Sequence, residues 1–186
     1  SFYPTKNLGA LGDGGLISTN DQTLYEWALK YRNYGSTIRY INDIQGVNSR
    51  LDELQASWLL VKTRMLDIQL NKRREIACQY TAAFQGLGDL ILPPANSDHT
   101  YHIYAVRTRL RNELADYLRM NEIDTVIHYP VPPHLQKCYA GYNYVKGDFP
   151  VSEELAETVL SLPLYPAMGE DQYQVIEAVK QFFEKQ

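Results

Sequence analysis

The chain has 186 residues, a formal net charge of −4 and a pI near 5.6, with 45% hydrophobic and 22% charged residues. These values are typical of a globular protein with a sizeable core, and they argue against non-specific nucleic-acid binding, which needs a basic surface. The apolar runs are too short to span a bilayer and no signal peptide is visible, so we expect a cytoplasmic protein without a membrane partner. Cys78 and Cys138 lie far apart, which predicts reduced thiols and no metal site.

The first fifty residues combine short strands, loops and one helix. Residues 1–3 are typical of the end of a buried strand, residues 4–15 of a glycine-rich loop, and residues 16–18 of a second short strand. N-cap residue types and an apolar stripe predict a helix over residues 20–35. The segment 36–49, which is rich in tyrosine, asparagine and glycine, is expected to be an irregular loop.

The clearest periodic signal comes next. Apolar residues spaced alternately by three and four form one face of a helix: Leu51, Leu54, Trp58, Val61, Met65 and Ile68. The phase breaks at Lys72 and resumes at Ile76, which predicts one long helix that is bent or interrupted around residues 69–71. Because such a helix can leave one domain and enter the next, we expect domains over residues 1–68 and 69–186.

The second half of the chain has mixed periodicity. We expect strands over residues 101–107 and 125–129 and a helix over residues 109–121. A loop with three prolines and two histidines follows the second strand, and helices beginning near Ser152 and Asp171 close the chain. This order predicts a small α+β domain.

Lys6 has unusual surroundings for a loop lysine. It follows an apolar strand end and Pro4, and it precedes a glycine-laden turn. A lysine that reacts covalently must be held rigidly where its amine can lose its charge, and glycines let the backbone approach a bulky ligand closely. The glycine spacing of GALGDGG is similar to a dinucleotide-binding fingerprint. It does not open a clear helix, however, and no acidic residue follows about twenty positions later in the right context, so the spacing favours a glycine-rich turn.

Three sequence motifs, in the expected order, resemble those of one known family. The string SFYPTKNLGALGDGG, followed by LISTND, resembles the lysine segment of the DegT/DnrJ/StrS sugar aminotransferases. GVNSRLDELQASWL resembles the second signature of that family, and IHYPVPPHLQ resembles the third. The resemblance implies an α/β chain that forms the C-terminal part of a type I transferase fold dependent on pyridoxal 5'-phosphate. Residues 1–68 would then complete the large cofactor-binding domain, residues 69–186 would be the small α+β domain, and the protein would be a homodimer with active sites at the subunit interface.

The resemblance also assigns cofactor-binding residues. Lys6 matches the lysine that binds pyridoxal phosphate covalently and then moves a proton during the reaction. Ser1 matches a serine whose hydroxyl binds the cofactor phosphate, and Asn48 an asparagine that reaches the phosphate of the neighbouring subunit. Without the resemblance, Ser1 would be interpreted as a polar residue at a strand end. Asn48 could also be the N-cap of the helix that starts near Leu51. Arg50 is either a phosphate partner or a surface arginine.

Further residues are candidates for contact with substrate. Their hydroxyl, imidazole and guanidinium groups can hydrogen-bond a sugar or a diphosphate: Tyr3, Arg39, Tyr40, His128, Tyr129 and His134. Each has a structural alternative. Tyr3 could instead pack in the core. The two residues of the irregular loop, Arg39 and Tyr40, could be solvated, and the three residues of the proline-rich loop could be partly buried structural residues.

The resemblance implies transfer of an amino group from glutamate to a keto-sugar nucleotide. NYGSTIRY, with the second and third motifs, looks most like transaminases of dTDP-3-keto-6-deoxyhexoses. Amination at C4, or a non-catalytic member that binds a sugar nucleotide or regulates transcription, remain alternatives, whereas Lys6 argues against a dehydratase, which has histidine there. The aspartate and the aromatic residue that contact the cofactor ring in this family would precede Ser1, so we expect these 186 residues alone to be inactive.

Overall fold

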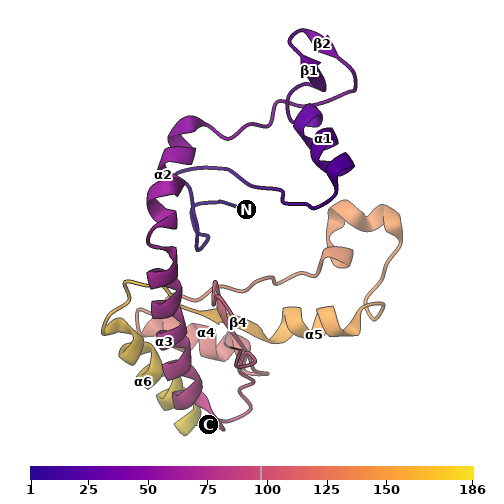
Figure 1. Ribbon diagram of the computed structural model, residues 1–186. Coiled ribbons are helices and arrows are strands. Elements are labelled where there is room, and N and C mark those ends of the chain that lie inside the picture. Colours follow the sequence, from indigo (N-terminus) through magenta and orange to yellow (C-terminus); the bar gives the residue numbers. More distant parts are fainter. Residues whose placement is uncertain (97) are drawn as a thin grey trace. The chain divides into compact units, whose positions relative to one another are not determined.

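The computed structural model describes residues 1–96 and 98–186. The chain divides into two compact units, Ser1–Asp67 and Ile68–Gln186, and each is considered by itself (Figure 1). Among the described residues, none of the helices combines the length and the apolar character that crossing a bilayer requires.

The first unit contains α1 (Gln22–Tyr31), β1 (Ser36–Ile38), β2 (Ile41–Asn42) and α2 (Glu53–Thr63). The predicted first helix is confirmed together with its cap. The Asp21 carboxylate accepts hydrogen bonds from the backbone N–H groups of Thr23 (2.8 Å) and Leu24 (3.1 Å), which satisfies two of the donors left over at a helix start.

The segment 36–49 was expected to be irregular, and this expectation is wrong for its first half. β1 and β2 pair antiparallel as a short hairpin. Its turn carries Tyr40 at φ 70°, a left-handed conformation that asparagine or glycine adopts more readily. The hairpin escaped prediction because the usual turn residues are absent from its tip.

Residues 16–18 form no strand, contrary to expectation. The side chains of Leu16 and Ile17 are 72% and 76% exposed, and a strand exists only where a neighbouring strand pairs with it. Residues 1–3 likewise lie in a loop and not in a strand.

The predicted long helix is interrupted, but at an earlier point than expected. α2 ends at Thr63 and α3 (Leu66–Phe84) begins three residues later. The backbone N–H of Met65 bonds to the carbonyl of Lys62 at 3.0 Å, and this tighter i to i−3 bond ends the ladder of α2. Residues 69–71, where the break was expected, continue α3 without interruption.

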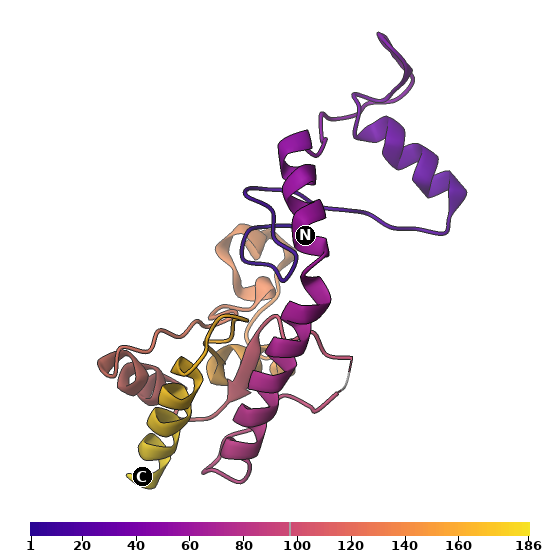
Figure 2. The ribbon, with the colours of Figure 1, turned by 60° about the vertical axis from the view of Figure 1, so that its left-hand side comes forward.

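The second unit is an α+β arrangement around one core (Figure 2). Its elements are α3, β3 (Tyr104–Arg107), α4 (Arg111–Met120), the 3-10 helices η1 (Pro133–Leu135) and η2 (Lys137–Tyr142), α5 (Pro150–Thr158), β4 (Val159–Leu162) and α6 (Asp171–Glu184). β3 and β4 are antiparallel, with Tyr104 opposite Leu162. The expected strand 125–129 is reduced to a single bridge between Val126 and Ser161.

β4 is a further strand that the sequence did not predict. All four of its residues, Ser161 included, are buried, so it lacks the alternation of buried and exposed residues that marks a half-exposed strand. Tyr80, Phe84 and Tyr104 form the aromatic centre of the same core. Burial raises the pKa of the Tyr104 hydroxyl to about 12, which keeps this group neutral.

Candidate functional site

The Lys6 loop closes on itself through backbone hydrogen bonds. The N–H of Phe2 donates to the carbonyl of Gly14 at 2.8 Å, and the N–H of Ala10 donates to the carbonyl of Phe2 at 2.7 Å. The N–H of Lys6 donates to the carbonyl of Tyr3 at 2.9 Å, which makes a tight turn at the lysine. The half-buried Lys6 therefore projects from a backbone that is fixed on both sides.

Gly9 is required by close packing inside this loop. A Cβ atom at Gly9 would lie 2.4 Å from the backbone oxygen of Pro4, a distance that no side chain tolerates. The proline before the lysine and the glycine after it thus touch directly. This contact gives a structural reason for the Pro-x-Lys-x-x-Gly spacing.

Gln55 of α2 holds the far end of the loop. Its side-chain oxygen accepts the backbone N–H of Leu11 at 2.8 Å, and its side-chain nitrogen would lie 3.0 Å from a Cβ atom at Gly12. Gln55 was not among the predicted site residues. It lies inside the second family motif, so the motif itself was the signal that could have identified it.

Ser1 and Tyr3 lie at the start of the same loop. The Ser1 hydroxyl accepts the backbone N–H of Tyr3 at 3.2 Å. Both side chains are exposed in the chain, which does not favour the core-packing alternative for Tyr3. The loop therefore brings a serine hydroxyl, a tyrosine and the Lys6 amine onto one short segment.

Asn48 lies in a second cluster of the first unit. Its amide nitrogen donates to the Tyr34 hydroxyl at 2.8 Å, and its amide oxygen accepts the Nε–H of Arg50 at 3.0 Å. The Arg50 guanidinium also lies over the Tyr34 ring, 5.7 Å from its centroid. Because the Arg50 N–H can only donate, this ring of contacts fixes which way the Asn48 amide faces.

Arg39 and Tyr40 form the tip of the hairpin that leads to this cluster. The Arg39 guanidinium lies over the Tyr40 ring at 4.9 Å, and the Tyr40 side chain is 85% exposed. The Asp43 carboxylate accepts a hydrogen bond from the Thr37 hydroxyl, and this contact holds the pKa of its carboxyl below the usual value. The Lys30 ammonium, 3.6 Å from the same carboxylate, acts in the same direction.

His128 and Tyr129 belong to the second unit. The His128 Nδ1 lies 2.8 Å from the Ser161 hydroxyl, so its ring is tied to β4. The Tyr129 side chain is 72% exposed, and its ring meets the His128 ring edge-on. Of these two residues, Tyr129 is the one whose side chain is open to a ligand.

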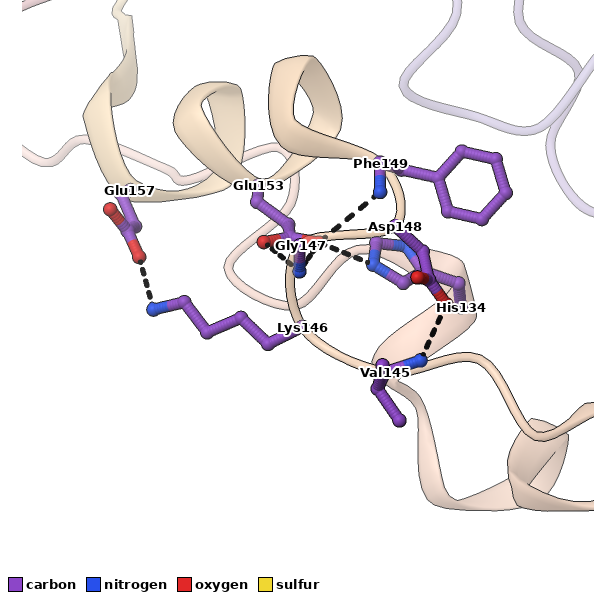
Figure 3. A network of polar contacts seen from close by, with 8 residues as sticks. All are labelled: His134, Val145, Lys146, Gly147, Asp148, Phe149, Glu153 and Glu157. Atoms are coloured by element: carbon purple, nitrogen blue, oxygen red, sulfur yellow. Dashed lines mark hydrogen bonds and ion pairs between the residues drawn. The ribbon is translucent and has the colours of Figure 1, made fainter.

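His134 forms a buried pair with Glu153 of α5, drawn in Figure 3. Its Nε2 lies 2.9 Å from a Glu153 carboxylate oxygen, and the two side chains are only 7% and 9% exposed. The backbone N–H of Gly147 donates to both oxygens of the same carboxylate, at 2.8 and 2.9 Å. This bond first, and the His134 contact after it, hold the pKa of Glu153 below its usual value.

The donor groups of the first unit fit a phosphorylated aldehyde. A primary amine at Lys6 can bond to an aldehyde carbon, while the Ser1 hydroxyl, the Asn48 amide and the Arg50 guanidinium can donate to phosphate oxygens. The structure thus groups Lys6, Ser1 and Tyr3 on one loop. It groups Asn48 with Arg50 beside the hairpin, whereas His128, Tyr129 and His134 belong to the second unit.

Comparison with known proteins gives the family of this chain. Residues 1–180 match the DegT/DnrJ/EryC1/StrS aminotransferase family. The dTDP-3-amino-3,6-dideoxy-alpha-D-galactopyranose transaminase of Aneurinibacillus thermoaerophilus is 45% identical over 98% of this chain and 55% of its own length. A pleiotropic regulatory protein of Geobacillus stearothermophilus is 43% identical over 98% of this chain and 50% of its own.

Solved structures give the same result. The crystal structure of Streptomyces venezuelae DesV in complex with a ketimine intermediate has a TM-score of 0.94, with 42% sequence identity, and it covers 98% of this chain and 50% of that one. The chain therefore spans about half the length of the curated relatives it matches. The predicted family and fold class are confirmed: the chain belongs to the DegT/DnrJ/EryC1/StrS aminotransferase family and has the C-terminal part of its type I fold.

Proposed function

We propose that the protein to which this chain belongs is a pyridoxal-phosphate-dependent aminotransferase that acts on a keto-sugar nucleotide. The observation that carries the proposal is the Lys6 loop. A lysine on a short turn, closed by the Phe2 hydrogen bonds and held to α2 by Gln55, is the rigid amine that covalent binding of an aldehyde cofactor requires. Family membership agrees with this chemistry.

The chain's own residues have distinct tasks in this reaction. When bound, pyridoxal phosphate supplies an aldehyde that bonds to amines and a conjugated ring that accepts electrons. The Lys6 amine would hold the cofactor between turnovers. Once released, it would take a proton from the donor carbon that bears the amino nitrogen and give it to the former aldehyde carbon of the cofactor, on the other side of that nitrogen. The Ser1 hydroxyl binds the cofactor phosphate.

Asn48 acts across a homodimer interface in this proposal. Its amide nitrogen carries two hydrogens, of which one is donated to the Tyr34 hydroxyl, so the second can donate to a phosphate oxygen of the partner's cofactor. The adjacent Arg50 adds positive charge near the same phosphate. The orientation of the amide by Tyr34 and Arg50 supports this role.

The proposed substrate is a dTDP-3-keto-6-deoxyhexose, and the proposed amino donor is glutamate. The activities for which two relatives are named support a dTDP-sugar, and a ketimine in a solved relative is the linkage between an amine and a keto carbon that such a transfer needs. Tyr3, Tyr129 and the hairpin tip offer hydroxyl and cationic groups for sugar and diphosphate. In this proposal, the buried His134 has a structural role that supports substrate binding.

A direct assay tests this proposal. Full-length protein loaded with pyridoxal phosphate should convert a dTDP-3-keto-6-deoxyhexose to the 3-amino sugar with glutamate, and the 4-keto isomer should react far more slowly. Preference for the 4-keto isomer would replace the C3 assignment with C4 amination. The Geobacillus relative's name favours one further candidate, a regulatory member, which would bind the sugar nucleotide without turnover.

A further inference from the structure

The segment from His128 to His134 is anchored at both ends by one continuous stretch of the chain, α5 and β4. At the first end, Ser161 exchanges backbone hydrogen bonds with Val126 (2.8 and 3.2 Å) and contacts the His128 ring. At the second end, Glu153 pairs with His134. Ser161 and Glu153 are both buried polar residues, which need such partners.

The turn that carries His134 is braced internally. The backbone N–H of Leu135 donates to Pro132 at 3.0 Å, and the N–H of Gln136 donates to Pro133 at 3.1 Å. The Gln136 side chain reaches back to the carbonyl of Val131 at 3.2 Å. With its prolines, this turn has little conformational freedom, so a movement of His134 must move the turn as a unit.

Glu153 organises more than one neighbour (Figure 3). A carboxylate can only accept hydrogen bonds, so the His134 Nε2 must carry a hydrogen, which fixes one ring nitrogen as a donor. The same carboxylate accepts the Gly147 N–H at 2.8 Å and the Phe149 N–H at 3.4 Å, and the Phe149 ring packs on His134 at 4.8 Å between centroids. Two further contacts lie beside the Glu153 carboxylate. The exposed Lys146 and Glu157 form an ion pair at 3.1 Å, and the Asp148 carboxylate accepts the backbone N–H of Val145.

We propose that Glu153 is a positioning residue for substrate binding, which acts through His134 on the segment that presents Tyr129. The inference rests on the proposed function and adds a residue that touches neither substrate nor cofactor. Loss of the carboxylate frees the second anchor while Ser161 still holds the first. The exposed Tyr129 then lies on a segment that is held only at its His128 end, so its position is less fixed and sugar-nucleotide binding weakens while cofactor binding is unchanged.

The test compares Glu153→Ala and Glu153→Gln with Glu157→Gln in the full-length holoenzyme. Glu157 lies one turn further along α5 and is exposed, so it is a matched control. A hydrogen bond to a charged group contributes about 1.5–3 kcal/mol, so the KM for the keto-sugar nucleotide should rise about tenfold or more in Glu153→Ala. In Glu153→Gln it should rise less, because the amide oxygen still accepts the Gly147 N–H. The cofactor absorbance and the kcat should stay near wild type.

If the wild type is active, two outcomes would overturn this inference but not the proposed function. In the first, both Glu153 variants have the same KM as the Glu157→Gln control. In the second, KM, kcat and cofactor affinity all worsen together. Should Glu153→Ala fail to fold because His134 is left unpaired, the Glu153→Gln comparison still decides. Amide hydrogen exchange at Gly147 and Phe149 gives a readout without turnover, and it should be faster in Glu153→Gln than in Glu157→Gln. A wild type that binds no cofactor would instead overturn the proposed function, and the substrate role of Glu153 with it.

Discussion

The conformation of the Lys6 loop requires glycine at position 9, because the space there is too small for a methyl group. Gly9→Ala would place Cβ 2.4 Å from the Pro4 oxygen, so the turn between them must open. We expect this variant of the full-length protein to bind pyridoxal phosphate at least tenfold more weakly, as measured by absorbance titration. Gly15→Ala is the control, since nothing lies within 4 Å of its Cβ position. Equal affinities in the two variants would contradict the role given to the Pro4–Gly9 contact.

The Glu153 carboxyl makes a second prediction at the residue scale. Its pKa is lower in the folded chain than the ordinary 4.5, first because of the Gly147 N–H and then because of His134. A lowered pKa means that Glu153 stabilises the fold above its ordinary pKa, and that this contribution is lost as the pH falls through the folded value. The difference in unfolding free energy between wild type and Glu153→Gln should therefore be constant above about pH 5.5 and shrink below about pH 4.5. Denaturant titrations across this range measure it, and a difference that grows toward acid would contradict it.

At the scale of elements, α3 is tied to the loops of the second unit by Arg73. Its guanidinium donates to the carbonyls of Tyr101 (3.2 Å), His102 (3.4 Å) and Leu164 (2.8 Å). Arg73 is buried, and this burial lowers its pKa, although the group stays charged. Arg73 thus links α3 to two segments that are distant in the sequence, residues 101–102 and Leu164.

Removal of this link should be costly. Arg73→Ala should lower the free energy of unfolding by about 3 kcal/mol, since it removes the hydrogen bonds to the buried carbonyls of Tyr101 and Leu164 and the packing of a buried side chain. The neighbouring Lys72 is exposed, and Lys72→Ala should change the stability by less than about 0.5 kcal/mol. Circular dichroism during denaturation measures both. Equal effects of the two substitutions would show that the Arg73 contacts do not hold α3.

At the scale of the whole molecule, the sequence was most informative where local spacing carries the structure. The helix capped by Asp21 and the presence of helical structure in α2 and α3 follow from short-range patterns, and three motifs were enough to identify the family. The β4 strand and the β1–β2 hairpin were missed, since the first is buried on all positions and the second turns at Tyr40. Gln55 lies within the second motif, but its contact with Leu11 joins distant parts of the chain, as does the contact of Glu153 with His134, and local spacing shows neither.

The site residues differ in how far the sequence could describe them. Lys6, Ser1 and Asn48 were found through motifs, and their roles stay predictions that the local geometry supports. The sequence could not distinguish His134 from Tyr129, although one is buried against Glu153 and the other is exposed. Burial depends on how α5 packs, and no pattern within the loop contains that information.

The most direct measurement of the central claim is the chemical identification of the residue that holds the cofactor. Full-length protein loaded with pyridoxal phosphate should show the absorbance of a lysine-bound cofactor. Reduction with borohydride, followed by peptide mass spectrometry, should then place the pyridoxyl group on Lys6. Lys6→Ala should lose both the absorbance and the label. A label on another lysine, or a wild type without the absorbance, would contradict the account.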